Sequence, residues 1–125
     1  MRSLQPFLYD DQINTVTFEL AHPMHTIVWE FTVREEQIAA FISAYDSDGD
    51  WAQLFRRADG HLGTELLRST SSPNVFLTID RWQSLASFEN FLDRFGAEYK
   101  KLDALFEGYT LAEKKVGVFS SLLRS

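Results

Sequence analysis

The stretch Gly63–Phe88, GTELLRSTSSPNVFLTIDRWQSLASF, decides the fold that this sequence predicts. Two runs rich in β-formers, Glu65–Thr70 and Val75–Trp82, flank a Ser-Ser-Pro-Asn segment. This segment signals a turn, because proline presets φ and asparagine tolerates the left-handed region. Ser84 then precedes an apolar periodic segment, where its hydroxyl can cap the first N–H groups of a helix. The sequence therefore predicts a β-hairpin with Trp82 at a strand-to-helix corner.

Working outward from the hairpin, hydrophobic periodicity predicts the remaining elements. Before it come a strand at Thr26–Val33, a helix at Glu35–Tyr45 and a short helix at Trp51–Arg57. After it come a long helix that bends near Gly96 and a strand at Thr110–Phe119. This order predicts an α+β fold of the ferredoxin-like, split βαβ type, an antiparallel sheet with its helices on one face. We expect one domain over residues 26–119, an N-terminal arm at 1–25 with a candidate extra strand at Ile13–Leu20, and a tail at 120–125.

Composition excludes several classes of protein. The chain has 125 residues, a net charge of -6 and no cysteine, which argues against nucleic-acid binding and excludes disulfides and thiolate metal sites. No segment is apolar and long enough to span a membrane, and the N-terminus lacks a signal peptide, so a cytoplasmic location is expected. Eleven Phe and three Trp indicate a large aromatic core, pocket or interface.

Alternation along the strands predicts which side chains share a face. One apolar set is expected to meet the helices: Ile27, Trp29, Phe31, Val33, Val75, Leu77 and Ile79. The opposite set mixes polar and aromatic side chains, which favours a ligand cavity covered by a second copy of the sheet. This set comprises Glu30, Thr32, Phe76, Thr78, Asp80 and Trp82.

Three motifs carry a family resemblance: Trp51-Ala52-Gln53-Leu54-Phe55, then Gly63, then Ile79-Asp80-Arg81-Trp82-Gln83-Ser84 with Phe88. Together they resemble the antibiotic biosynthesis monooxygenase family. The resemblance implies a dimeric α/β barrel. It also implies one of several activities, since members include oxygenases without metal or flavin, quinol oxidases, haem-degrading enzymes and proteins of unknown activity.

The haem-degrading branch matches this chain least well. Its first-strand Asn is absent from Thr26–Val33, its long-helix Trp corresponds to Phe91, and its haem-ligating His falls near Lys101. These three departures argue against haem, and the expected cofactor is none.

Candidate catalytic residues are the carboxylates Glu30 and Asp80 and the histidine His61. Burial would raise the pKa of at least one carboxyl group and make it a general base, while His61 has an ordinary pKa suited to accepting a proton. The structural alternatives are salt links from the carboxylates to Arg81, Arg68 or Lys114, and a solvated loop for His61.

Candidate substrate-binding residues are Thr32, Phe76, Thr78, Trp82 and Trp51. For the tryptophans, packing in the core is the alternative. Two further patterns resemble metal sites, but an ordinary loop explains each of them better. Asp46, Asp48 and Asp50 alternate as in a calcium loop but lack its glycine and glutamate positions, and His22 and His25 have no third ligand nearby.

Two hypotheses for function follow. The first is a cofactor-independent monooxygenase that acts on a small aromatic or quinol-like substrate, with a base that generates an electron-rich anion in a dry pocket. The second is a non-catalytic barrel that binds a small apolar ligand or only dimerises, because a fold does not fix a function. Both hypotheses include a homodimer and no nucleic-acid or membrane partner.

Overall fold

The computed structural model describes residues 24–122, so the predicted strand at Ile13–Leu20 and His22 lie outside the described residues. Its four strands form one sheet in the order β2-β3-β1-β4. Every neighbouring pair is antiparallel. The strands are β1 (His25–Val33), β2 (His61–Arg68), β3 (Val75–Trp82) and β4 (Thr110–Phe119).

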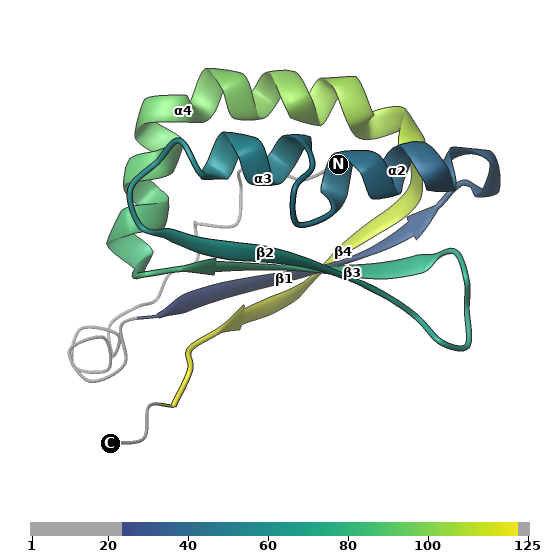
Figure 1. Cartoon of the computed structure of the whole chain (residues 1–125), viewed down its shortest axis with the longest axis horizontal. Helices are drawn as coiled ribbons and strands as arrows, with labels where there is room; N and C mark the ends of the chain where they lie inside the picture. The colour runs from purple at the N-terminus through teal and green to yellow at the C-terminus, as the bar shows by residue number, and fades with distance from the viewer. Residues whose placement is uncertain (1–23, 123–125) are drawn as a thin grey trace.

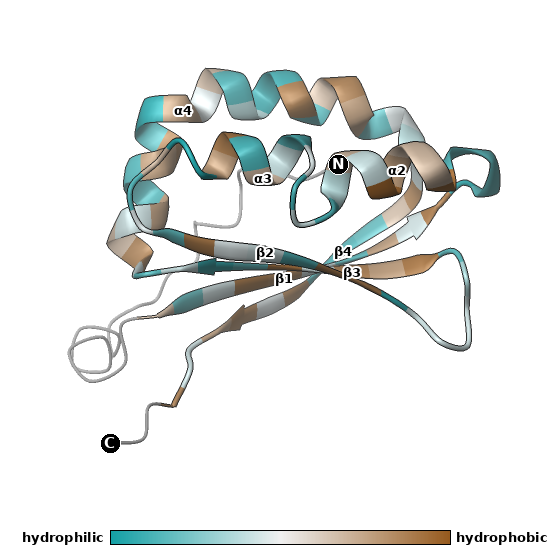
Figure 2. Cartoon of the chain, viewed as in Figure 1, coloured by the Kyte–Doolittle hydropathy of each residue, from teal (hydrophilic) through white to brown (hydrophobic). Residues whose placement is uncertain are grey.

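The helices cover one face of this sheet (Figure 1). They are η2 (Glu35–Gln37), α2 (Ile38–Tyr45), α3 (Asp50–Phe55), α4 (Leu85–Phe106) and η3 (Glu107–Tyr109). Figure 2 shows hydrophobic and hydrophilic segments alternating along α4, as expected for a helix with one buried side. The predicted ferredoxin-like, split βαβ arrangement is confirmed.

The helix cap and the helix bend lie where the sequence predicted them. The hydroxyl of Ser84 accepts a hydrogen bond from the backbone N–H of Ser87, which caps the start of α4. The backbone of α4 leaves helical geometry at Phe95, next to the predicted bend at Gly96. In the hairpin turn, Arg68 donates from Nε to the carbonyl oxygen of Pro73.

Strand β2 begins earlier than the sequence suggested. His61 was expected in a loop, but it is the first residue of β2 and lies across from Trp82 of β3. Gly60, just before it, has φ of 96°, a conformation that glycine adopts without steric cost. The expected loop at His61 was therefore wrong. The turn at Gly60 lets β2 pair with β3 from His61 onward, four residues before the predicted run of β-formers at Glu65–Thr70.

The predicted assignment of faces was wrong for β3. In the antiparallel register, Trp29 of β1 pairs with Thr78 and Ile27 pairs with Asp80. Directly paired residues point to the same side of a sheet. The buried set of β3 is therefore the one that faces the helices: Phe76, Thr78, Asp80 and Trp82.

Glu30 and Thr32 point to the opposite, open face, where they pair with Leu77 and Val75. A cavity lined by all six predicted residues is thus excluded, because the sheet separates Glu30 and Thr32 from the other four.

Candidate functional site

A chain of hydrogen bonds connects three side chains on the helix-facing side of β2 and β3. Thr64 Oγ1 donates its hydrogen to Asp80 Oδ1 over 2.8 Å, and Thr64 Oγ1 also lies 3.0 Å from His61 Nε2. Asp80 retains only 1% of its exposure, so this carboxylate is anchored in the interior. Two of the three predicted catalytic residues, His61 and Asp80, are therefore brought together, with Thr64 joining them.

The chain defines the protonation pattern of His61. A threonine hydroxyl has a single proton, and Thr64 gives it to Asp80. The Thr64 oxygen can then only accept from His61, so Nε2 carries the imidazole proton. In neutral His61 this leaves Nδ1 as the ring nitrogen with a lone pair that can accept a proton.

Aromatic rings surround His61. Its ring centroid lies 5.1 Å from that of Trp82 and 5.4 Å from that of Phe55. Burial among these side chains lowers the pKa of His61 below its ordinary value, and the charge of Arg56 lowers it further. The Asp80 carboxylate and a hydrogen bond with the backbone of Gly63 raise this pKa in part. His61 is therefore neutral at pH 7 and next to a carboxylate that would stabilise its protonated form.

Two fully buried polar atoms lie on the same side of β3. Thr78 is 1% exposed and Trp82 is 0% exposed. Thr78 Oγ1 and Trp82 Nε1 have no hydrogen-bond partner among residues 24–122. An unpaired buried donor or acceptor costs about 1–3 kcal/mol. Because buried polar atoms are normally hydrogen-bonded, these two atoms beside a hydrogen-bonded carboxylate make this side of β3 a candidate site for a ligand.

A second histidine lies on the other side of Trp82. His25 of β1 and His61 of β2 both pair with Trp82 across the sheet. The ring of His25 stacks on Phe88 of α4, at 5.7 Å between centroids, so it too faces the helices. Burial, and then the charge of Lys115, lower the pKa of His25 to about 4. Trp82 thus stands between two histidines that are both neutral at pH 7.

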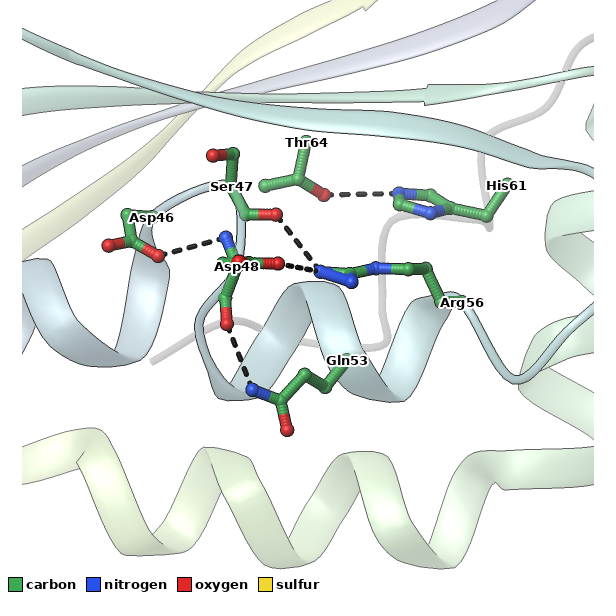
Figure 3. Close-up of polar contacts among 7 residues, drawn as sticks. All are labelled: Asp46, Ser47, Asp48, Gln53, Arg56, His61 and Thr64. Atoms are coloured by element: carbon green, nitrogen blue, oxygen red, sulfur yellow. Dashed lines mark hydrogen bonds and ion pairs between the residues drawn. The ribbon is translucent and has the colours of Figure 1, made fainter.

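The acidic loop before α3 is held by local contacts (Figure 3). Asp46 Oδ1 accepts from the backbone N–H of Asp48, and Asp48 forms a 2.7 Å ion pair with Arg56. Gln53 donates to the backbone oxygen of Asp48. Within residues 24–122, no group of three or more His, Asp or Glu side chains is arranged to hold a metal ion. These contacts hold an ordinary loop before α3, whose N-cap is Gly49 and which has no side-chain cap.

The remaining predicted site residues lie elsewhere. Phe76 is on the helix-facing side of β3, but its ring packs against Phe41, 5.1 Å away, toward α2. Trp51 of α3 is fully buried among other rings, with Tyr99 at 5.0 Å between centroids. Glu30, on the open face, lies across from Lys114 of β4.

Sequence reasoning missed Thr64, His25 and Lys115 as residues of this region. The alternation of β2 places Thr64 opposite Asp80, and a register shift between His61 and Gly63 lets His61 and Thr64 share a face. That irregularity has no clear sequence signal beyond Gly63 itself. His25 had been considered only as a loop histidine with no third metal ligand nearby, and Lys115 had been given no role.

Comparison with known proteins identifies relatives of the whole domain. The family model described as "Antibiotic biosynthesis monooxygenase" matches residues 24–101. No match was found among curated proteins.

Within residues 24–122, no helix combines the length and hydropathy needed to cross a bilayer.

Several solved structures share the fold. SnoaB, a cofactor-independent oxygenase from Streptomyces nogalater, is 21% identical with a TM-score of 0.61, over 82% of this chain and 96% of that chain. Protein SO0527 from Shewanella oneidensis is 16% identical with a TM-score of 0.62, over 82% and 95%. A conserved protein from Methanosarcina mazei is 10% identical with a TM-score of 0.60, over 86% and 99%. At such identities these likenesses show the fold alone.

The segment that the family model matches runs from the start of β1 into the second half of α4. It includes the strand-to-helix corner at Trp82 and the chain from His61 to Asp80. It also covers more than half of the 125 residues. On this match, the chain belongs to the antibiotic biosynthesis monooxygenase family.

Proposed function

We propose that this protein is a cofactor-independent monooxygenase that acts on a small aromatic or quinol-like substrate. The observation that carries the proposal is the chain from His61 through Thr64 to the buried Asp80 carboxylate. A neutral imidazole whose Nε2 is linked through Thr64 to a carboxylate is suited to take a proton at Nδ1 from a phenol or an activated CH₂ group. The family membership supports the same class of reaction.

The reaction needs no reductant other than the substrate. His61 Nδ1 accepts a proton and leaves an electron-rich aromatic anion, which transfers an electron to dioxygen. For a ring CH₂ group the balance is R₂CH₂ + O₂ → R₂C=O + H₂O: two C–H bonds break, one oxygen atom enters the product and the other leaves as water. The substrate supplies all the electrons. The aromatic side chains around His61 exclude water from the reactive anion.

Thr78 and Trp82 supply the polar contacts for the substrate. The Thr78 hydroxyl and the Trp82 indole N–H lack partners within the described part of the chain. A substrate oxygen that accepts from the indole N–H would remove one cost of burial. The Asp80 carboxylate would stabilise the protonated His61 through Thr64 after proton transfer.

Oxygen uptake with a panel of hydroquinones and anthrones tests the proposal. The native protein should consume oxygen, and Thr64→Val should lower kcat/KM by about 100-fold, since general-base catalysis contributes about 10²–10⁴-fold. The matched control is Glu65→Gln. Glu65 is next to Thr64 in the chain, but its side chain pairs with Arg81 rather than with Asp80, so this substitution should leave the rate unchanged. Absence of uptake with every substrate, or equal rates for the Thr64 variant and the native protein, would contradict the proposal.

One observation favours a binding protein instead. The lowered pKa of His61 makes it a weaker base than a free imidazole. The unpaired Thr78 and Trp82 atoms would serve a bound ligand equally well. Saturable binding of a hydroquinone without oxygen uptake would support this alternative.

We also propose that the open face of the sheet forms a homodimer, as a dimeric α/β barrel requires. That face carries aliphatic pairs, Val28 with Ile79 and Leu67 with Leu77. Phe119 at its edge is 51% exposed. Burying such a surface in a partner is favourable.

Light scattering should give twice the monomer mass at micromolar concentration. Leu77→Lys should yield a monomer, whereas Leu105→Lys, at an exposed position on α4, should not. A monomeric native protein would refute the dimer. The cytoplasmic location stays a prediction.

A further inference from the structure

The acidic loop between α2 and α3 holds the guanidinium group of Arg56 in place. Arg56 Nη2 donates to the carbonyl oxygen of Ser47 over 3.1 Å and to Asp48 Oδ1 over 2.7 Å. The loop has internal hydrogen bonds of its own, because Asp46 Oδ1 accepts from the backbone N–H of Asp48 and Gln53 donates to the backbone oxygen of Asp48. A long, exposed side chain is therefore bound at two points by an ordered loop.

This guanidinium group lies close to the base of the proposed site. Phe55, the residue before Arg56, ends α3, and its ring centroid is 5.4 Å from that of His61. In Figure 3, the Arg56 side chain lies between α3 and the strand that carries His61 and Thr64. The loop therefore fixes a positive charge on the side of α3 that faces His61.

Two charged side chains of residues 24–122 act on His61 from different elements. Burial lowers the pKa of His61, the Asp80 carboxylate of β3 raises it, the Arg56 charge at the end of α3 lowers it, and a hydrogen bond with the backbone of Gly63 raises it. Asp48 carries the opposite charge to Arg56 and lies 2.7 Å from it. The Asp48 carboxylate therefore offsets part of the field that Arg56 exerts on His61.

We propose that Arg56 is a positioning residue for proton transfer, and that the Asp48–Arg56 ion pair sets the pH range in which neutral His61 can accept a proton. The Arg56 charge keeps His61 neutral to lower pH, and the Asp48 carboxylate limits the loss of basicity that this charge causes. This inference rests on the proposed function for the role of His61 as the base. The coupling itself is a property of the free protein.

NMR titration of the His61 imidazole in the ligand-free protein tests the coupling, with His61→Gln identifying the signal. Arg56→Gln removes the cation and leaves the Asp48 carboxylate, so the proton affinity of His61 should rise about threefold, as expected for a unit charge acting across solvent. Asp48→Asn keeps an oxygen that can accept from Arg56 but removes the opposing charge, so the proton affinity should fall. Both changes should shrink in about 0.5 M NaCl, because salt screens exposed charges.

The matched control is Arg57→Gln. Arg57 is the next residue in the chain, but its guanidinium carbon lies 4.9 Å from the ring centroid of Phe95 on α4, so this substitution should leave the His61 titration nearly unchanged. Arg56→Lys keeps the charge and should stay close to native. A native titration in Arg56→Gln would overturn the proposal. So would changes of the same sign in Arg56→Gln and Asp48→Asn, because disturbing a purely structural loop has no reason to reverse sign with the charge removed.

Oxygen uptake tells failure of this proposal apart from failure of the proposed function. If His61 is the base, the acid limb of the pH profile of kcat/KM should move in the same direction as the His61 titration in each variant. Opposite changes in the titration without oxygen uptake would refute the oxygenase and keep the coupling. Uptake with a titration that neither substitution changes would do the reverse.

Discussion

The layer between the sheet and the helices has two ends of different character, although one strand, β3, runs through both. At one end Phe76 packs within a cluster of rings that includes Phe41 and Tyr45, whose centroids are 4.1 Å apart. At the other end the same face of β3 carries Thr78 and Asp80. Rings are in contact at both ends, since Trp82, beyond Asp80, lies 5.6 Å from Phe55 between centroids. The polar end adds a hydrogen-bonded carboxylate and a hydroxyl with no partner in the described part of the chain.

The two ends therefore contribute differently to the stability of the folded protein. Packed rings stabilise the aromatic end through buried area and favourable ring contacts. The polar end gives up part of that gain, because unpaired buried groups are costly. Residues held at such a cost are expected at a functional site rather than in a core that only supports the fold.

The largest expected effect is at the aromatic end. Trp51→Ala should lower the free energy of unfolding by about 3–5 kcal/mol, because it removes a fully buried side chain and leaves a cavity. Urea denaturation measures this, and Leu105→Ala, at an exposed position, should change it by less than about 0.5 kcal/mol. Trp51→Phe should retain ligand affinity if Trp51 only packs. Weaker binding in that variant would extend the ligand site into the aromatic end, as the sequence suggested.

A smaller effect should appear with pH at the polar end. His25 has a folded-state pKa of about 4 against an ordinary value of 6.5, so the unfolded chain binds more protons between these pH values. The His25 contribution to stability is therefore present above about pH 6.5 and is lost as pH falls toward about 4. At pH 5 the loss should be about 2 kcal/mol.

Comparing urea unfolding of the native protein and His25→Gln at pH 7.5 and pH 5 isolates this term. The variant should lose less stability between the two pH values. Equal losses in both proteins would show that His25 is not buried as a neutral group.

The smallest effect should have opposite signs for stability and binding. Thr78→Val removes a buried hydroxyl without a partner in residues 24–122 and keeps the side-chain shape, so it should raise the free energy of unfolding by about 1 kcal/mol. It should also weaken binding of 2-naphthol, because it deletes a proposed ligand contact. Thr32→Val, on the open face of β1, should leave binding unchanged. If Thr78→Val destabilised the protein, the hydroxyl would have a structural partner and the contrast between the two ends would weaken.

The elements themselves were predictable because their signals are local. The bounds of β4 were predicted as Thr110–Phe119 and those of β3 as Val75–Trp82, and both match the structure. The cap at Ser84 and the bend beside Gly96 rest on chemistry within one or two turns of helix. The candidate site was only partly predictable. Asp80 and His61 were recognised as residue types, but the link through Thr64 joins two strands.

The sequence by itself determined the order of strands and helices, the family, and the alternation within each strand. Tertiary structure decided which alternating set of β3 faces the helices. A period of two gives two equivalent choices for every strand, and only the register between strands selects one. Counting apolar residues favoured Val75 and Leu77 as the inner set. The register with β1 instead buries Thr78 and Asp80, because Trp29 and Ile27 lie directly across from them.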